Sequence, residues 1–268
     1  MKKIALASVK SAVNVTSGTY RLRLNEPDIS ANARAGQFVN VVIPNCAGIL
    51  WRRPFSVHCT DPAHGTFDLL FNAVGCGTRA LKNIKPGEKL NILGPLGNTF
   101  AYSADLKEAI LVAGGLGIAP FLLLCRELSD RQFNISLFYG VDTAHHFCCL
   151  DEFTDLGVTL HLTTEDGSKG KRGVITESLE IYLENLAQKA GRELFVCGPT
   201  PMLSKTRSLA LDMGIRAQVS VENMMACGFG ACMGCPVRKT TPSSDGQIYN
   251  LACTDGPVFY MDEICFDD

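Results

Sequence analysis

Four cysteines near the C-terminal end limit what this chain can fold into more than any other feature. Cys227, Cys232 and Cys235 fall within nine residues, and Cys253 follows after seventeen intervening residues. A C-x4-C-x2-C spacing with a distant fourth cysteine is typical of a plant-type [2Fe–2S] cluster. Glycines separate the first three cysteines, and glycine lets backbone N–H groups turn towards cluster sulfurs. The pattern predicts that these four thiolates bind an iron–sulfur cluster.

Two other interpretations of the four cysteines stay open. A structural zinc site usually takes its ligands as two close C-x2-C pairs, whereas the first step here is x4 and Cys253 has no close partner. The four residues can also be ordinary buried cysteines, since free cysteine often packs as a small hydrophobic side chain. The spacing favours the cluster over both.

Length and composition indicate about two domains with a hydrophobic core. The chain has 268 residues, 46% of them hydrophobic and 19% charged, and a net charge of −2. This balance gives no reason to expect nucleic acid or an anionic membrane as a partner, and no stretch approaches the ~20 apolar residues of a membrane span. The first residues begin like a signal peptide, but Lys10, Asn14 and Thr16 interrupt them. We therefore expect a cytoplasmic protein whose cysteines are mostly reduced thiols or metal ligands.

Short strand-like segments follow one another through residues 1–100. They are alternating or β-branched, and turn residues such as Ser17-Gly18, Asp61-Pro62 and Pro86-Gly87 separate them. The segments are 4–15, 20–24, 38–43, 55–58, 66–71 and 89–93. Regularly spaced short strands of this kind predict an antiparallel barrel.

Two motifs in this barrel are suited to binding phosphate. Arg53-Pro54-Phe55-Ser56 offers a guanidinium, which grips phosphate through paired N–H donors, and a hydroxyl for a ring edge. Gly75-Cys76-Gly77-Thr78 opens a short helix, whose first N–H groups can also reach a phosphate. Either motif alone is weak, because arginine–proline pairs and glycine turns are common.

Residues 101–218 alternate between strand and helix. Apolar strands are expected at 109–113, 135–140, 158–164 and 193–199, with helices at 121–128, 176–190 and 201–213. This rhythm predicts a doubly wound parallel sheet. Gly114-Gly115-Leu116-Gly117-Ile118-Ala119-Pro120 joins the first strand to the first helix, where glycines let a pyrophosphate approach a helix N-terminus. His145-His146 beside Cys148-Cys149 could suggest a metal by residue type, but a surface or half-buried loop is the expectation. His58, His64 and His161 are interpreted in the same way.

In this order, the barrel motifs resemble the flavin site of the ferredoxin–NAD(P) reductase superfamily. The resemblance implies that Arg53, Pro54, Phe55 and Ser56 hold flavin and pyrophosphate, although that family often has tyrosine where Phe55 stands. It also implies FAD as cofactor, with further contacts from residues that cradle the isoalloxazine or cap the pyrophosphate. These are Leu70, Phe71, Asn72, Gly77 and Thr78.

The resemblance extends to two nicotinamide-nucleotide motifs. The first implies contacts from Gly114, Gly115, Gly117 and Pro120. The second runs from Cys197 through Gly198 and Pro199, and in that family its cysteine lies beside the nicotinamide ring and has a catalytic role; an ordinary buried thiol stays the alternative for Cys197. Asp142 follows the second strand, where the family reads the adenine ribose. An acidic side chain there repels a 2′-phosphate, and no lysine or arginine occurs from 140 to 150, so NAD is favoured over NADP.

The C-terminal region is similar to one branch of that superfamily, the electron-transfer subunits of NAD-dependent (class 1B) dihydroorotate dehydrogenases. The cluster loop, the returning Cys253 and the following Asp255-Gly256-Pro257-Val258-Phe259 all match. The resemblance implies an FAD-binding barrel at 1–100, an NAD-binding domain at 101–218 and a small [2Fe–2S] module at 219–268. It further implies a heterotetramer, two copies of each chain, with an FMN-containing catalytic subunit that oxidises dihydroorotate in pyrimidine (UMP) biosynthesis.

Two competing functions stay open at this stage. Electron-transfer subunits of NAD(P)H–ferredoxin reductases, sulfide dehydrogenases and some hydrogenases share the flavin, nucleotide and cluster layout. A zinc-bearing interaction module on a degenerate nucleotide fold is the alternative from outside the oxidoreductases.

Overall fold

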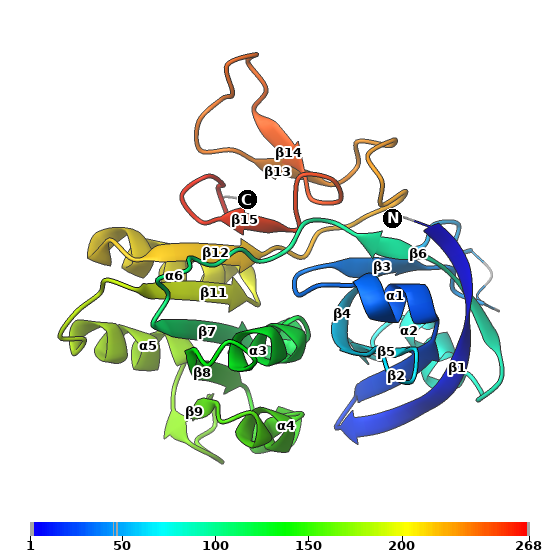
Figure 1. Cartoon of the computed structure of the whole chain (residues 1–268), viewed down its shortest axis with the longest axis horizontal. Coiled ribbons are helices and arrows are strands. Elements are labelled where there is room, and N and C mark those ends of the chain that lie inside the picture. The colour runs from blue at the N-terminus through cyan, green and yellow to red at the C-terminus, as the bar shows by residue number, and fades with distance from the viewer. Residues whose placement is uncertain (1–2, 45, 47, 267–268) are drawn as a thin grey trace.

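The first hundred residues form a closed antiparallel barrel (Figure 1). The computed structural model describes residues 3–44, 46 and 48–266. In spatial order the strands are β1 (Lys3–Thr16), β2 (Thr19–Asn25), β5 (Thr66–Asn72), β4 (Arg53–Asp61), β3 (Phe38–Val41) and β6 (Lys89–Leu96). The barrel closes because β6 pairs with β1. Two short helices, α1 (Pro27–Asn32) and α2 (Cys76–Lys82), lie in its connections.

The alternation along β2 shows why the segment forms a half-buried strand. Leu22 and Leu24 point into the core and are fully buried. Arg21 and Arg23 project from the other face, where both bond the buried carboxylate of Asp68 on β5. The period of two thus separates apolar from charged side chains.

The next region forms a seven-stranded sheet, which appears beside the barrel in Figure 1. In spatial order its strands are β10 (Lys171–Arg172), β9 (Thr159–Thr164), β8 (Asn134–Val141), β7 (Glu108–Gly114), β11 (Arg192–Cys197), β12 (Arg216–Ser220) and β15 (Val258–Tyr260). The connecting helices are η1 (Gly115–Ile118), α3 (Phe121–Ser129), η2 (Ala144–His146), α4 (Leu150–Asp155), α5 (Ile175–Glu184) and α6 (Thr200–Met213). The chain runs outward from β7 to β10 and then returns to β11, so the strand order reverses between β7 and β11. Ligands bind at such a switch point, outside the carboxyl ends of the strands.

The predicted barrel and parallel sheet are confirmed, and three details differ. The expected helix at 176–190 ends at Glu184, because the Asn185 side chain bonds the Ile181 carbonyl and caps the last turn. β12 runs through residue 218, where the sequence suggested a boundary. β15 belongs to the C-terminal region but pairs antiparallel with β12, so it completes the sheet.

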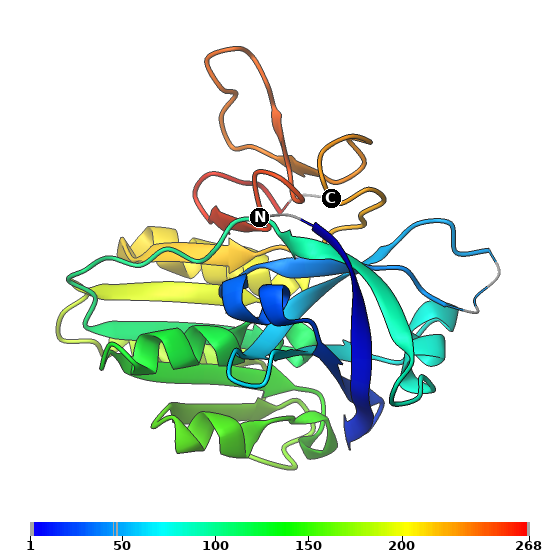
Figure 2. The ribbon, with the colours of Figure 1, turned by 45° about the vertical axis from the view of Figure 1, so that its right-hand side comes forward.

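The remaining C-terminal residues form a small projecting module. β13 (Pro236–Arg238) and β14 (Tyr249–Leu251) pair as an antiparallel hairpin that stands away from the sheet and the barrel (Figure 2). Asn98, just after the last barrel strand, ties down the chain between the fourth cysteine and β15. Its amide donates to the carbonyls of Asp255 and Val258, and its oxygen accepts from the Val258 N–H.

No helix in the part of the chain that the structure describes is long and apolar enough to cross a membrane.

Candidate functional site

The four cysteines of the C-terminal module gather as two pairs. The thiol of Cys232 lies within hydrogen-bonding reach of Cys227, and that of Cys235 lies within reach of Cys253. Three of the sulfurs are buried and Cys232 is exposed. Among the described residues, no three of these sulfurs lie within 4.8 Å of one another. A single tetrahedral zinc ion would need them about 3.8 Å apart, so the paired arrangement fits a two-iron cluster better than zinc.

The backbone around Cys227 prepares its sulfur to carry charge. The N–H groups of Phe229 and Cys232 point at Cys227 Sγ from 3.5 and 3.4 Å. Burial alone would raise the pKa of this thiol, but the N–H donors outweigh it and lower the pKa to about 6. Thiolates are the form that binds iron, and N–H donors to the sulfur tune a bound cluster. The residues present therefore fit the group that their spacing predicts.

Gly228 allows the cluster loop to lie directly on the barrel. Its φ is +78°, and a Cβ there would stand 2.2 Å from the Asn40 amide nitrogen. That buried amide, on β3, instead donates to the Cys227 carbonyl at 3.2 Å. The loop is thus held against the barrel strand that also carries Phe38, a residue of the cavity described next.

A cavity of about 430 Å³ opens between the barrel and the residues after β12. It is lined by most of the predicted flavin contacts, together with Glu222, Asn223, Met225 and Pro257 from the C-terminal region. The predicted contacts found there are Pro54, Phe55, Ser56, Leu70, Phe71, Asn72 and Thr78. Phe55 and Phe71 pack edge to face, with ring centroids 5.8 Å apart. The concave, largely apolar lining fits an isoalloxazine ring.

Two predicted flavin residues lie outside this lining. Arg53 is exposed at the start of β4, and its guanidinium bonds only the nearby carbonyls of Trp51 and Arg52 within the described residues. Gly77 is buried in α2, where a Cβ would meet the Ile49 side chain at 2.9 Å. A side chain at Gly77 would displace the tip of Ile49, while Thr78 beside it lines the cavity.

Glu222 is a cavity residue that sequence patterns do not single out. It follows β12 and lines the cavity, where the residue is exposed to solvent. Partial loss of hydration beside the neighbouring protein atoms raises the pKa of Glu222. A carboxyl in this position places a titratable charge beside any ring bound in the cavity.

A second cavity, of about 650 Å³, lies at the switch point of the sheet. It is lined by Gly114 and Gly115 at the end of β7, by Asp142 after β8 and by Pro199 after β11, all four predicted as nucleotide contacts. Asn72 and Leu116 line both this cavity and the flavin cavity, so the two adjoin. The arrangement would bring a nucleotide and a flavin into contact.

The other predicted nucleotide residues shape this region without lining it. Gly117 packs against the end of β11, where a Cβ would stand 2.1 Å from the Cys197 carbonyl oxygen. Gly198 has a φ of +159° and approaches Gly114 with no room for a Cβ. Pro120 is buried and caps the start of α3.

Asp142 sits exposed at the rim of the nucleotide cavity and pairs with His146. The hydrogen bond from His146 lowers the pKa of Asp142, so the side chain is anionic at neutral pH. The structure also brings in a neighbour that the range 140–150 does not contain. The 165–170 loop bonds the backbone here, through the Asp166 N–H to the Asp142 carbonyl, and carries Lys169.

Cys197 is buried at the end of β11 and lies behind both cavities rather than in their linings. Burial raises its pKa far above the usual value, and the nearby Glu222 raises it further. The side chain of Ser220, which lines the flavin cavity, lies within reach of the thiol. Cys197 is therefore a neutral thiol close to the junction of the two cavities.

Three family profiles match successive parts of the chain. They are an oxidoreductase FAD-binding domain over residues 5–102, an oxidoreductase NAD-binding domain over 111–208, and the iron–sulfur cluster binding domain of dihydroorotate dehydrogenase B over 222–265.

Curated relatives match nearly end to end. The chain is 33% identical over 260 residues to the dihydroorotate dehydrogenase B (NAD(+)) electron transfer subunit of Desulforamulus reducens, covering 97% of both chains. Against the subunit of the same name from Geobacillus kaustophilus the identity is 35%, covering 96% of both.

The chain belongs to the dihydroorotate dehydrogenase B electron transfer subunit family. As a member of this family it is an oxidoreductase subunit with FAD-binding, NAD-binding and iron–sulfur cluster binding domains. The cysteine module therefore falls within an iron–sulfur domain, and the zinc-module interpretation is dropped.

Solved structures add a second relationship. The structure of an NADH-dependent reduced ferredoxin-NADP oxidoreductase is 29% identical to this family member, with a TM-score of 0.85, and the match covers 98% of this chain and 90% of that one. A ferredoxin-NADP+ reductase from Plasmodium falciparum has a TM-score of 0.69 at 16% identity, covering 82% of this chain and 97% of that one, which shows the shared fold alone.

Proposed function

We propose that this chain passes electrons between the FMN of a dihydroorotate dehydrogenase catalytic subunit and NAD, through its own [2Fe–2S] cluster and FAD, in pyrimidine (UMP) biosynthesis. The observation that carries the proposal is the match to dihydroorotate dehydrogenase B electron transfer subunits, at 33–35% identity over nearly the full length of each chain. The three adjoining sites support it, because a chain with this function needs a cluster, a flavin and a nicotinamide within reach of one another.

The chemistry that the bound groups supply is a conversion between paired and single electrons: a nicotinamide carries a hydride, a cluster carries one electron, and a flavin accepts either. The protein's own residues bind and orient these groups. Met225 lines the flavin cavity two residues before the ligand Cys227, and Asn72 lines both cavities. This order supports a path in which the flavin stands between cluster and nicotinamide.

We assign three regions to these tasks, an FAD-binding barrel (1–100), an NAD-binding domain (101–218) and a cluster module (219–268). Within the proposal Cys227, Cys232, Cys235 and Cys253 are the cluster ligands, and Cys197 assists at the nicotinamide. The chain would act in the cytoplasm, where its twelve cysteines stay reduced. It would assemble as two copies with two FMN-containing catalytic subunits.

A second candidate is favoured by one observation. The likeness to the NADH-dependent reduced ferredoxin-NADP oxidoreductase structure spans 98% of this chain, so an electron-transfer subunit of a related NAD(P)H–ferredoxin reductase is the alternative. The two candidates share all three cofactor sites and differ in the partner that meets the cluster.

Purification with the partner separates these candidates. The tagged chain, isolated anaerobically from its own host, is expected to carry FAD and about two irons per chain and to bring down an FMN protein that reduces its flavin with dihydroorotate. An iron–sulfur-rich large subunit without FMN would instead support the ferredoxin reductase.

We further propose that NAD is preferred over NADP, because the anionic Asp142 at the cavity rim repels a 2′-phosphate. Asp142→Asn is expected to lower the KM for NADPH by about tenfold, corresponding to ~1.4 kcal/mol of lost repulsion, while changing that for NADH little. The measurement is NADH- and NADPH-dependent dye reduction by the flavin-loaded chain, with the exposed Asp212→Asn as control. Equal use of both nucleotides by the unmodified chain would contradict the assignment and point to Lys169 as the residue that dominates.

A further inference from the structure

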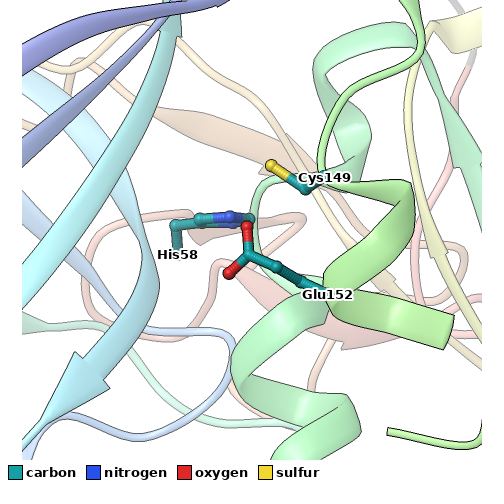
Figure 3. Close-up of side chains that lie close together, drawn as sticks. All are labelled: His58, Cys149 and Glu152. Carbon is teal, nitrogen blue, oxygen red and sulfur yellow. The ribbon is translucent and has the colours of Figure 1, made fainter. Parts of the chain in front are cut away.

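Three side chains with metal-binding atoms meet where the barrel packs against the sheet domain, away from the four cluster cysteines. They are His58 on β4, Cys149 at the start of α4, and Glu152 one turn into that helix (Figure 3). One ligand atom from each lies within 4.8 Å of the other two. In Figure 3 the imidazole, the sulfur and the carboxylate point towards a common space. Sequence patterns suggested a half-buried loop histidine for His58, but its side chain is fully buried.

The hydrogen bonding of His58 leaves one nitrogen available to a metal. Its Nδ1 lies 2.8 Å from the Ala119 carbonyl oxygen. Since a carbonyl only accepts, Nδ1 carries the proton and Nε2 carries the lone pair. Nε2 is buried and makes no well-formed hydrogen bond among the described residues, and the Cys149 thiol is its neighbour. Metal-binding histidines are usually fixed in this way, with the second nitrogen donating to a carbonyl or carboxylate. A fully buried, unpartnered Nε2 is costly unless a ligand occupies it.

The two residues from α4 are positioned by the helix and by the barrel. Cys149 is the N-cap residue of α4, with a φ of +60°, and Glu152 lies three positions on, which brings both side chains to one face of the first turn. Arg21 of β2 forks onto the Glu152 carboxylate and is itself paired with Asp68 at 2.7 Å. This fixes the carboxylate in place, and each oxygen keeps a second lone pair for a metal.

We propose that His58, Cys149 and Glu152 bind a zinc ion that joins the barrel to the sheet domain. One nitrogen, one sulfur and one oxygen donor suit Zn²⁺, and three protein ligands leave a fourth position for water. Bonds of about 2.0–2.3 Å place ligand atoms roughly 3.3–3.8 Å apart, so zinc binding would draw together three atoms that now lie within 4.8 Å of one another. Binding releases the Cys149 thiol proton to solvent, and the ion then faces the thiolate and a carboxylate that Arg21 also bonds. The site is independent of the proposed electron transfer.

X-ray absorption at the zinc edge tests the site directly. The protein is purified with its flavin and iron cluster intact, dialysed against Zn²⁺, and washed before metal analysis. We expect about one zinc per chain whose shell holds one sulfur at about 2.3 Å and two or three nitrogen or oxygen atoms. A four-sulfur shell would place the zinc at the Cys227–Cys253 cluster ligands, and a shell without sulfur would place it on the surface; either result overturns the proposal.

Variants give a second test that needs no spectroscopy. Cys149→Ser and His58→Gln are each expected to weaken zinc binding by about tenfold or more. Cys265→Ser, whose thiol bonds the Lys239 carbonyl in the C-terminal module, should leave zinc binding unchanged. Flavin content and circular dichroism report whether each variant is folded. Unchanged zinc affinity in folded Cys149→Ser, or equal loss in Cys265→Ser, contradicts the ligand set. If no ligand variant folds, the zinc-edge X-ray absorption spectrum of the unmodified protein still decides whether one sulfur and two or three nitrogen or oxygen atoms bind the ion.

Discussion

Cys227 shows how a single residue combines what a sequence reveals with what only a fold supplies. Its proposed role as a ligand rests on the spacing to Cys232 and Cys235, because cluster binding needs thiolates at set intervals in one loop. Its lowered pKa depends on the N–H groups of Phe229 and Cys232. Those donors point at the sulfur because Gly228 and Gly230 adopt positive φ. The ligand set could therefore be proposed from the sequence, whereas the electrostatic preparation of Cys227 could not.

Glu222 offers a prediction at the same scale. A carboxylate beside the flavin disfavours added negative charge, so Glu222→Gln is expected to raise the flavin midpoint potential by on the order of tens of millivolts. Because partial loss of hydration raises the pKa of Glu222, the carboxyl gains its proton at a higher pH than a free glutamate does. The difference between variant and unmodified protein should therefore shrink as pH falls from 8 towards 5.

Potentiometric titration of the bound flavin measures this effect, with the exposed Glu263→Gln as control. A difference that stays constant over that pH range would show that Glu222 is not the charge that the flavin senses.

At the scale of elements, the contact between the β7 turn and the end of β11 sets the nucleotide cavity. Gly117→Ala forces a Cβ against the Cys197 carbonyl oxygen, which stands 2.1 Å from that position. Neither partner can move without shifting a strand, so we expect a loss of about 2–4 kcal/mol in the free energy of unfolding and weaker nucleotide binding.

Gly115→Ala is the matched comparison for this prediction. It has open space for a Cβ and only an unfavourable φ of +53°, which costs about 1–2 kcal/mol. Denaturant unfolding and NADH titration of both variants make the measurement. If both variants lost the same unfolding free energy and NADH affinity, backbone strain at the turn, rather than the close approach to β11, would explain the loss.

Asn98 makes the corresponding prediction for the cluster module. Its side chain makes three hydrogen bonds to the chain that follows Cys253, one to Asp255 and two to Val258 at the start of β15. At about 1 kcal/mol each, Asn98→Ala should weaken this tether by roughly 2–3 kcal/mol and speed cluster loss under mild denaturant. Asn185→Ala, which removes one exposed helix-end bond, should leave the rate of iron release unchanged; similar release from both variants would contradict the role of the tether.

The elements divide into those that local pattern determines and those that partners determine. β5 and β7 were predictable because their apolar residues form strands in any packed context. β15 was not, because a three-residue strand gains its pairing only from β12. The same holds within the sites. Phe55 and Thr78 could be predicted by motif, whereas Glu222 and His58 acquire their surroundings from elements distant in sequence.

At the scale of the whole molecule, the fold places the cluster loop, the flavin cavity and the nucleotide cavity next to one another in that order. The cluster loop rests on β3 through Asn40 and Cys227, the flavin cavity lies under the residues that precede this loop, and Asn72 and Leu116 join it to the nucleotide cavity. The hairpin of β13 and β14 projects beyond this line (Figure 2). Such an order suits a chain that relays electrons between a bound nicotinamide and another protein.

The central claim is tested most directly by dihydroorotate-dependent reduction of NAD+ in the complex of this chain with an FMN-containing catalytic subunit. We predict that the unmodified chain and Cys265→Ser, which alters a thiol outside the ligand set, both couple the two reactions. Cys227→Ser should retain flavin and NADH-dependent dye reduction but reduce NAD+ with dihydroorotate only at background rate. Full coupling in Cys227→Ser, or none in the unmodified complex, would contradict the account.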